Sequence, residues 1–304
     1  MRILVTGTSG LLGLNLALEN ARKHMVFGVD RLPLKTDAFQ VIQADLLHLG
    51  VLEHLFEQTQ PDWVIHCAAL ADMEACETNP SLAQQLNAEL PGELAALVAR
   101  CGARLVHIST DAVFDGQRGN YTEKDSPNPL SVYARTKLDG ERAVTQANPD
   151  TIIARVNMFG WSPSGKRSLA EFFVYNLKAG KPVKGFTDVY FCPLLVNDLA
   201  YILVEMLEKD LQGFYHVFSS ECISKYDFGM SIAQQFNFDT RLITPSSVNQ
   251  SGLQATRAPL LTMDTTKLSH ALGRSLPRMA SGIERFYELY KQGYPQKIKG
   301  YITG

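Results

Sequence analysis

Short apolar runs alternate with longer segments of helical periodicity over the first 160 residues. The apolar runs predict strands, and runs such as Ile3-Leu4-Val5 are apolar on both faces, which is typical of strands buried in a parallel sheet. The segments between them have the apolar spacing of helices. This alternation predicts an α/β fold with a doubly wound parallel sheet. Strands are expected at 2–6, 25–30, 41–45, 63–67, 104–109 and 151–156, and helices at 11–23, 49–58, 82–100 and 132–146.

The pattern changes after residue 160, where Gly and Pro interrupt the chain more often. We expect residues 1–160 to form a cofactor-binding core and residues 161–304 mainly a smaller substrate-binding lobe, with some segments returning to the core. A polar stretch without periodicity, 245–256, predicts a loop over the cleft. Helices in this half are expected at 169–178, 196–208, 225–236 and 282–290.

Composition narrows the class of protein. The 304 residues are 45% apolar and 20% charged, which is ordinary for a globular domain, and a formal charge of −2 offers no field for binding nucleic acid. The longest apolar stretch, 193–207, is interrupted by polar residues, so no membrane span is expected. Met1-Arg2 leads directly into an apolar strand, which leaves no room for a secretory leader. A cytoplasmic protein that binds small molecules is expected, and a homodimer is left open.

The five cysteines show no metal-ligand spacing and no C-x-x-C pair. They favour reduced thiols over a disulfide framework or a zinc site. The cysteines are Cys67, Cys76, Cys101, Cys192 and Cys222.

Three glycines separate the first strand from the first helix. Without side chains, Gly7 and Gly10 allow a tight turn and close approach of a pyrophosphate to the helix N-terminus, and Gly13 allows close packing of helix and strand. A bare glycine triplet also occurs in ordinary turns, so its place between a strand and a helix decides whether it indicates phosphate binding. That place predicts a Rossmann-type dinucleotide site, whose phosphate-binding turn comprises Gly7, Ser9, Gly10, Leu11, Leu12 and Gly13.

Two acidic residues follow the next strands. Asp30 ends the second strand, where a carboxylate accepts hydrogen bonds from ribose hydroxyls, and this slightly favours NAD as cofactor. Arg31 offers a partner for adenine or a 2′-phosphate, so NADP stays open. Asp45 and Leu46 are placed like an adenine contact, and the alternative for Asp45 is a helix cap before Leu47.

Tyr133 and Lys137 lie one helical turn apart, so both point to the same side of a helix. A nearby ammonium stabilises the phenolate and eases proton transfer by the phenol. The same spacing recurs at Tyr287 and Lys291. Only Tyr133 follows a core strand and so reaches the carboxyl edge of the sheet, and it is therefore the predicted catalytic tyrosine.

Four motifs together resemble the extended short-chain dehydrogenase/reductases, and within them the dTDP-4-dehydrorhamnose reductases. Further similarity at 213–216, 226–228 and 256–261 extends the resemblance through nearly the whole chain. The four motifs are Gly7-x-x-Gly10-x-x-Gly13, His66-Cys67-Ala68-Ala69, Ile108-Ser109-Thr110-Asp111-Ala112-Val113-Phe114-Asp115-Gly116 and Tyr133-x-x-x-Lys137.

The resemblance implies roles for individual residues. Thr110 would hydrogen-bond the substrate carbonyl, Tyr133 would protonate it, and Lys137 would hold the nicotinamide ribose. By residue type, Thr110 and Asp111 each have an alternative role, in which the side chain hydrogen-bonds the backbone. The resemblance also implies cofactor contacts at Cys67, Ala68, Ala69, Asn87 and Ser109, and substrate contacts at Asp111, Val113, Phe114, Asn157, Trp161 and Arg257.

The chain departs from the reductase pattern in two places. The segment 70–74 lacks the threonine that the reductases usually carry there, and Asn157 replaces a tryptophan and is more typical of epimerases and dehydratases. Trp161 either takes over that role or belongs to the core. The arginine that the epimerases often carry before residue 196 is absent, and Cys192-Pro193 is closer to the reductases.

Charged residues in the second half suggest a site for the substrate diphosphate. Arg257 offers paired donors to phosphate oxygens, and Lys166 and Arg167 are weaker candidates that also suit a solvated loop. Glu74 and Glu77 are three residues apart, which is more typical of a helix start facing solvent than of a metal site.

The expected function is the NAD(P)H-dependent reduction of a nucleotide-linked 4-keto-6-deoxy sugar. The alternatives are an epimerase or dehydratase that recycles bound NAD, and a non-catalytic subunit resembling the regulatory subunit of methionine adenosyltransferase. The sequence does not determine the sugar, the nucleotide, the stereochemistry of reduction or the oligomeric state.

Overall fold

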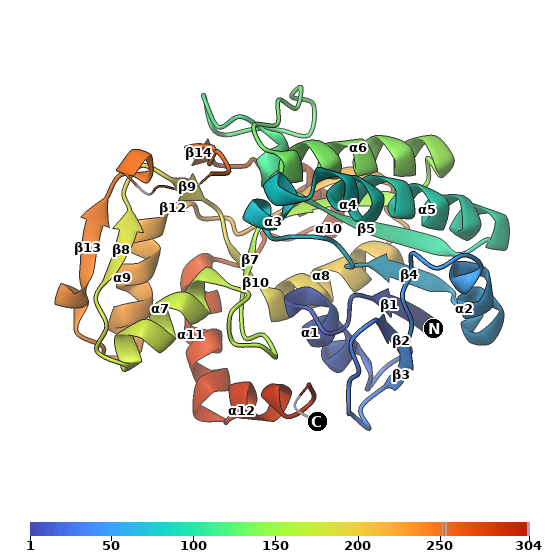
Figure 1. Ribbon diagram of the computed structural model, residues 1–304, viewed down its shortest axis with the longest axis horizontal. Helices are drawn as coiled ribbons and strands as arrows, with labels where there is room; N and C mark the ends of the chain where they lie inside the picture. The colour runs from blue at the N-terminus through green and yellow to red at the C-terminus, as the bar shows by residue number, and fades with distance from the viewer. Residues whose placement is uncertain (251, 253, 303–304) are drawn as a thin grey trace.

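A seven-stranded parallel sheet forms the centre of the molecule, in the order β11-β6-β5-β4-β1-β2-β3 (Figure 1). The computed structural model describes residues 1–250, 252 and 254–302. The chain order reverses between β1 and β4, which makes this the switch point of a Rossmann-type doubly wound sheet, as predicted. The strands are β1 Arg2–Thr6, β2 Met25–Asp30, β3 Gln40–Gln43, β4 Trp63–His66, β5 Arg104–Thr110, β6 Ile152–Val156 and β11 Gly213–Val217.

Helices cover both faces of this sheet. Ile3 and Val5 of β1 point to the face packed by α1 and α8, whereas Leu4 points to the face packed by α2 and α5. Alternate residues of one strand are thus buried in two separate cores, which explains why the strands are apolar throughout. The helices of the first half are α1 Leu11–Asn20, α2 Val51–Thr59, α3 Met73–Thr78, α4 Pro80–Gln84, α5 Leu90–Cys101 and α6 Val132–Ala147, with a π-helical turn Gln85–Glu89 joining α4 to α5.

A smaller lobe stands beside the carboxyl edge of the sheet, at the left of Figure 1. It is built from three small sheets, β10-β7, β12-β9-β14 and β13-β8, together with α7, α9 and α11. Its strands are β7 Met158–Phe159, β8 Val183–Phe186, β9 Tyr190–Phe191, β10 Leu194–Leu195, β12 Ile223–Ser224, β13 Ile243–Ser246 and β14 Leu260–Leu261. The remaining helices are α7 Leu169–Lys178, α8 Val196–Glu208, α9 Lys225–Gln235, α10 Thr266–Leu272, α11 Met279–Lys291 and α12 Tyr294–Lys299, and 3₁₀ turns occupy Asp111–Val113, Thr240–Leu242 and Val248–Gln250.

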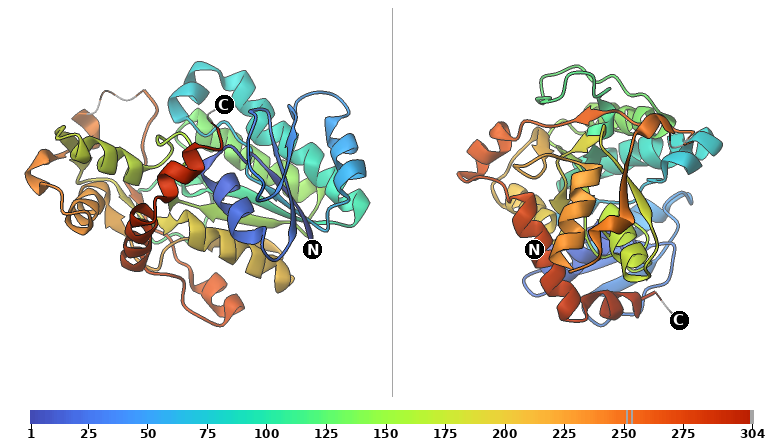
Figure 2. Two further views of the ribbon diagram at one scale, coloured as in Figure 1. Left: turned by 90° about the horizontal axis from the view of Figure 1, so that it is seen from below. Right: turned by 90° about the vertical axis from the view of Figure 1, so that its left-hand side faces the viewer.

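The chain crosses between core and lobe more than once. After β10 it returns through α8 and β11, and β11 pairs with β6 to complete the central sheet. At the far end of the chain, α12 comes back to the first helix, where the Tyr294 hydroxyl donates a 2.7 Å hydrogen bond to Asn15 (Figure 2). Of the predicted loop 245–256, residues 251 and 253 lie outside the described residues. No helix in the described part of the chain is long and apolar enough to cross a bilayer.

The prediction of reduced thiols is wrong for two of the five cysteines. Cys192 and Cys222, 30 residues apart, form a disulfide, while Cys67, Cys76 and Cys101 are free. The antiparallel pairing of β12 with β9 brings the two cysteines together, because each lies next to one of these strands. Such a pairing depends on tertiary structure, so the spacing along the chain gave no sign of it.

Candidate active site

The glycine turn between β1 and α1 has no room for side chains. Gly7 adopts a φ of +72°, and a Cβ there would lie 2.7 Å from the Ala68 nitrogen. A Cβ at Gly13 would lie 2.2 Å from the Gly7 oxygen, so strand and helix touch backbone to backbone. No side chain caps α1 at Gly10 and no acidic residue stands in its first turn. Its first amides are thus available to an anion such as a pyrophosphate.

Asp30 ends β2 beside this turn. Its carboxylate accepts hydrogen bonds from the backbone N–H of Ser9 at 2.8 Å and of Leu32 at 3.0 Å, which holds it at the glycine turn. Arg31 is exposed and free to meet a ribose or a 2′-phosphate. Asp45 accepts from the Leu47 N–H at 3.1 Å within a turn and does not cap a helix, because α2 begins only at Val51, after Gly50.

The segment after β4 runs along the glycine turn. Cys67 and Ala68 are partly buried and Ala69 is exposed, and Ala68 N–H donates to the Thr6 hydroxyl at 3.2 Å. Burial raises the pKa of the Cys67 thiol to about 12. The fully buried Asn87 accepts from Leu70 N–H at 2.9 Å and donates to the Leu70 carbonyl at 3.1 Å. In this structure Asn87 therefore fixes the loop after β4.

The predicted catalytic residues gather where β5 meets α6. Ser131 caps α6 by accepting the Ala134 N–H at 3.2 Å, and Tyr133 follows in the first helical turn. One turn later, Lys137 is buried and donates to the Ile108 carbonyl at 2.7 Å. Thr110, the last residue of β5, accepts the Ala112 N–H at 3.2 Å. Strand end and helix start thereby place these side chains at one edge of the sheet.

Burial determines the protonation of this group. It raises the pKa of Tyr133, and the Thr110 hydroxyl only partly opposes the rise. This direction is opposite to the stabilised phenolate that the Tyr-Lys spacing predicts, and it keeps the tyrosine a neutral proton donor near neutral pH. Burial also lowers the pKa of Lys137 to about 8, against the opposing charge of Glu141.

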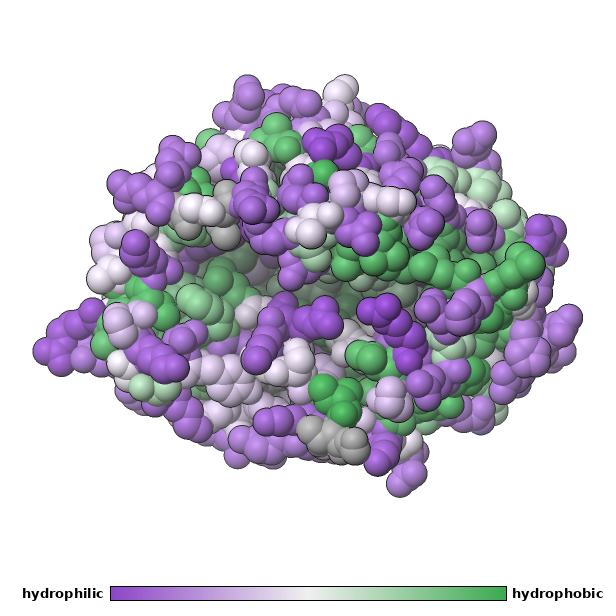
Figure 3. All heavy atoms as spheres, viewed as in Figure 1, coloured by the Kyte–Doolittle hydropathy of each residue, from purple (hydrophilic) through white to green (hydrophobic). Residues whose placement is uncertain are grey.

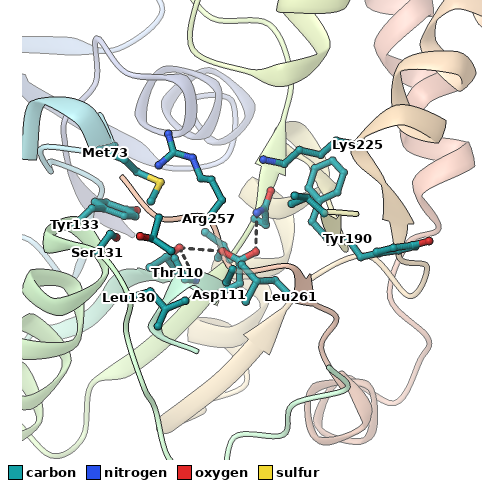
Figure 4. A pocket seen from close by; sticks show the side chains of 18 of the residues that line it. Met73, Thr110, Asp111, Leu130, Ser131, Tyr133, Tyr190, Lys225, Arg257 and Leu261 are labelled. Carbon is teal, nitrogen blue, oxygen red and sulfur yellow. Dashed lines mark hydrogen bonds between the residues drawn. The ribbon is translucent and has the colours of Figure 1, made fainter. Parts of the chain in front are cut away.

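A cavity of about 330 Å³ opens beside Tyr133, between core and lobe (Figure 4). The molecular face in Figure 3 is hollowed near its centre, with polar side chains around the opening. Inside the cavity, Thr110 donates to Asp111 at 3.0 Å and Asn157 donates to Asp111 at 2.7 Å. Burial raises the pKa of Asp111 in spite of these two bonds. Thr110, Tyr133, Asp111, Asn157 and Arg257 therefore line one cavity.

Glu74 joins the two sides of the cavity. It forms an ion pair with Arg257 at 3.0 Å and accepts the Gln254 N–H at 3.1 Å. Glu77 accepts the Val132 N–H at 2.8 Å, at the start of α6. Helix α3 does begin here, but the prediction that both carboxylates face solvent is wrong, because they bind segments distant in sequence. No cluster of His, Cys, Asp and Glu among the described residues could hold a metal ion.

Three predicted substrate contacts are wrong. Val113 and Phe114 are fully buried, because the 3₁₀ turn after β5 directs them into a core cluster away from the cavity. Trp161 is fully buried too, stacked on Phe286 at 4.0 Å, with its indole N–H donating to the Phe286 carbonyl at 3.0 Å. It belongs to the lobe's aromatic core, and so it does not replace the missing tryptophan at Asn157.

Several other predicted residues lie apart from the cavity or turn away from it. The Ser109 hydroxyl donates to Glu141 at 2.5 Å, so only its backbone is left for a cofactor. Lys166 and Arg167 are exposed and do not line the cavity. The second tyrosine-lysine pair is also remote from it. Tyr287 packs against Phe236, and the Lys291 ammonium lies over the Tyr287 ring.

The sequence reasoning missed several residues that line the cavity. Lys225 starts α9, a helix whose place in the fold the sequence did not reveal. Ser131 could have been found as the polar residue before a predicted helix. Other missed residues include Met73, Leu130, Val189, Tyr190, Phe191, Thr256 and Leu261.

Comparison with known proteins agrees with this fold. The family model described as RmlD substrate binding domain matches residues 1–292. A probable low-salt glycan biosynthesis reductase, Agl14 of Haloferax volcanii, is 33% identical over 286 residues, which cover 92% of this chain and 95% of that protein. Methionine adenosyltransferase 2 subunit beta of Rattus norvegicus is 31% identical over 254 residues, 80% of this chain and 75% of that protein.

A solved structure shows the same architecture. The dTDP-4-dehydrorhamnose reductase of Bacillus anthracis in complex with NADP superposes with a TM-score of 0.85 and 25% identity, covering 94% of this chain and 98% of that one. The matched family extends from the glycine turn through the cavity residues of the lobe. The chain therefore belongs to the RmlD substrate binding domain family.

Proposed function

We propose that this protein is an NAD(P)H-dependent reductase that converts the keto group of a nucleotide-linked 4-keto-6-deoxy sugar to an alcohol. The observation that carries the proposal is that Tyr133 and Thr110 line one cavity, with Lys137 buried one helical turn after Tyr133, in a fold whose glycine turn fits a pyrophosphate. Residues 1–160 would bind the cofactor and the later residues mainly the sugar. The relatives named as reductases support the reductase activity, and the one solved with NADP supports an NAD(P) cofactor.

Each residue has a defined task in the proposed reaction. Thr110 positions the substrate carbonyl oxygen, and Tyr133 donates its phenolic proton to that oxygen. The reducing hydride comes from bound NAD(P)H. The Lys137 ammonium binds near the cofactor ribose and stabilises the phenolate that remains on Tyr133, which must be reprotonated from solvent before the next cycle. Asp30 favours NADH at the ribose, and Arg31 allows NADPH.

The test is single-turnover oxidation of bound NADH or NADPH with a panel of nucleotide-linked keto-sugars. Tyr133→Phe removes only a hydroxyl, so it should lower the rate on the order of 10² to 10⁴-fold while cofactor binding persists. Lys137→Met should lower the rate similarly and also weaken cofactor binding. The two losses should not add, because both residues serve one proton transfer.

Two other functions give different results in the same experiment. An epimerase or dehydratase would return its cofactor to the starting redox state, so no net NAD(P)H oxidation would accompany turnover. The similarity to methionine adenosyltransferase 2 subunit beta favours a regulatory subunit as the second candidate. A near wild-type rate in Tyr133→Phe, or no turnover with any sugar of the panel, would favour that candidate over the reductase.

A further inference from the structure

Two cations meet at one end of the cavity. In Figure 4 the side-chain tips of Arg257 and Lys225 lie on the same side, away from Leu130. Arg257 is already engaged, because it pairs with Glu74 at 3.0 Å and donates to the Ala255 carbonyl at 3.1 Å. The Lys225 ammonium instead lies over an aromatic ring.

The Lys225 ammonium makes no hydrogen bond or ion pair within the described residues. The ammonium lies over the face of the Phe186 ring, with its Nζ 6.0 Å from the ring centroid. Asp111, the carboxylate whose charge favours this ammonium, accepts hydrogen bonds from Thr110 and Asn157 and forms no ion pair with Lys225 among the described residues. An ammonium carries three donors, and leaving them unpaired in a partly buried site is costly. Lys225 is therefore suited to binding an anion that enters the cavity.

Electrostatics support the same reading. Burial lowers the pKa of Lys225, the Arg257 guanidinium adds to the decrease, and Asp111 only partly opposes it. Two like charges beside one cavity destabilise each other until an anion lies between them. Phosphate oxygens suit this pair, because Arg offers paired donors and Lys a compact charge.

The position of the cations along the cavity indicates which anion they take. The predicted catalytic hydroxyls of Thr110 and Tyr133 lie on the side of α6 and β5, whereas Lys225 comes from the lobe. In a nucleotide-linked pyranose the phosphate is attached at C1, which lies across the ring from C4. A sugar whose C4 carbonyl meets Tyr133 therefore directs its phosphate away from the catalytic residues.

We propose that Lys225 binds the sugar-linked phosphate of the substrate diphosphate, together with Arg257, and so sets the cavity's specificity for nucleotide sugars over free sugars. This role rests on the proposed reductase function, but it concerns a residue outside the catalytic group.

The test compares two changes at Lys225 by calorimetric titration with dTDP and with UDP. Lys225→Met keeps the length of the side chain and removes its charge, so the Kd for these nucleotides should rise roughly tenfold to a hundredfold. Lys225→Arg should retain most of the affinity. NADPH should bind all variants equally. Lys184→Met is the matched control, because Lys184 is exposed on β8 of the same lobe, and it should bind like the wild type.

Unchanged dTDP and UDP binding in Lys225→Met would overturn the proposal, and so would a loss confined to NADPH. Titration with UDP-glucose and UDP-glucuronate distinguishes a sugar carboxylate from the phosphate, since a loss seen only with the glucuronate also overturns it. Circular dichroism and the intact NADPH affinity report on folding. If nucleotide binding depends on Lys225 but no keto-sugar is reduced by the wild type, the phosphate site stands and the reductase function fails. If Lys225→Met reduces the sugar as well as the wild type does, the reductase function stands and the phosphate site at Lys225 fails.

Discussion

The buried ion pair behind the catalytic helix offers a test of how the scaffold supports Lys137. Glu141 lies one helical turn after Lys137 and is 1% exposed. It accepts hydrogen bonds from Arg155 Nε at 2.9 Å and Nη2 at 2.7 Å, and from the Ser109 hydroxyl at 2.5 Å. Arg155 is 3% exposed and lies over the Phe114 ring. This pair connects β5, β6 and α6 directly below the proposed active site.

Glu141→Gln should be strongly destabilising. The substitution leaves the Arg155 guanidinium buried without a counter-charge and turns an amide N–H₂ towards existing donors. Breaking a buried pair from one side costs about 3 to 5 kcal/mol, a large part of the roughly 5 to 15 kcal/mol that stabilises a typical domain. The change also removes a charge that raises the pKa of Lys137, so this pKa should fall further below about 8.

Urea unfolding and a pH-rate profile measure the two effects separately. Asp139→Asn is the control, because Asp139 is 42% exposed on the same helix and pairs with Arg142 on the surface, so it should cost less than about 1 kcal/mol. The double change Glu141→Leu with Arg155→Met should recover much of the stability but keep the lowered Lys137 pKa. A loss below about 1 kcal/mol in Glu141→Gln, together with an unshifted pH profile, would refute this account of the pair.

Three further predictions concern the cofactor and the catalytic group. Lys137 carries its charge only below its pKa of about 8, so kcat/KM should decrease as the pH rises through that value, and a profile flat to pH 10 would contradict the role of the ammonium. Asp30→Ala removes the carboxylate that disfavours a 2′-phosphate, so titration should show the NADPH-to-NADH affinity ratio rising about tenfold, and an unchanged ratio would assign the ribose contact elsewhere. Tyr287→Phe should leave turnover within about twofold of wild type, because Tyr287 packs in the lobe, and loss of turnover in a folded variant would contradict the placement of the active site.

The features that the sequence predicts well are local ones. Five of the first six strands are recognisable because their inner residues are buried and mostly apolar, whereas β3 is an edge strand whose Val41 and Ile42 are only partly buried. The glycines of the turn are close together in the sequence, and so are Tyr133 and Lys137. Local spacing is therefore enough to predict that the residues of each motif lie close together in space. Strand β11 was missed, because its Phe214, Tyr215 and His216 give no continuous aliphatic run.

The features that the sequence did not predict depend on contacts between distant segments. A tryptophan such as Trp161 can either contact a sugar or pack in a core. Its stacking on Phe286 shows that it packs in the core. The ion pair of Glu74 with Arg257 spans 183 residues of chain. Lys225 was overlooked because a lysine at a helix start is ordinary, and only its enclosure beside Asp111 gives it chemical meaning.

The distribution of residues along the chain separates the proposed cofactor site from part of the proposed substrate site. The glycine turn, Asp30 and the Tyr133-Lys137 helix all lie in the first half and are fixed by the central sheet. The core contributes Thr110 and Tyr133 to the cavity, and separate crossings into the lobe add Asn157 after β6, Lys225 after β12 and Arg257 before β14. Each crossing can change without altering the sheet, because loops tolerate substitution better than the strands that carry them. A change at Asn157 or Lys225 should therefore alter which sugar enters while cofactor affinity stays constant, which is how one fold can serve relatives as different as a glycan reductase and a subunit of a methionine adenosyltransferase.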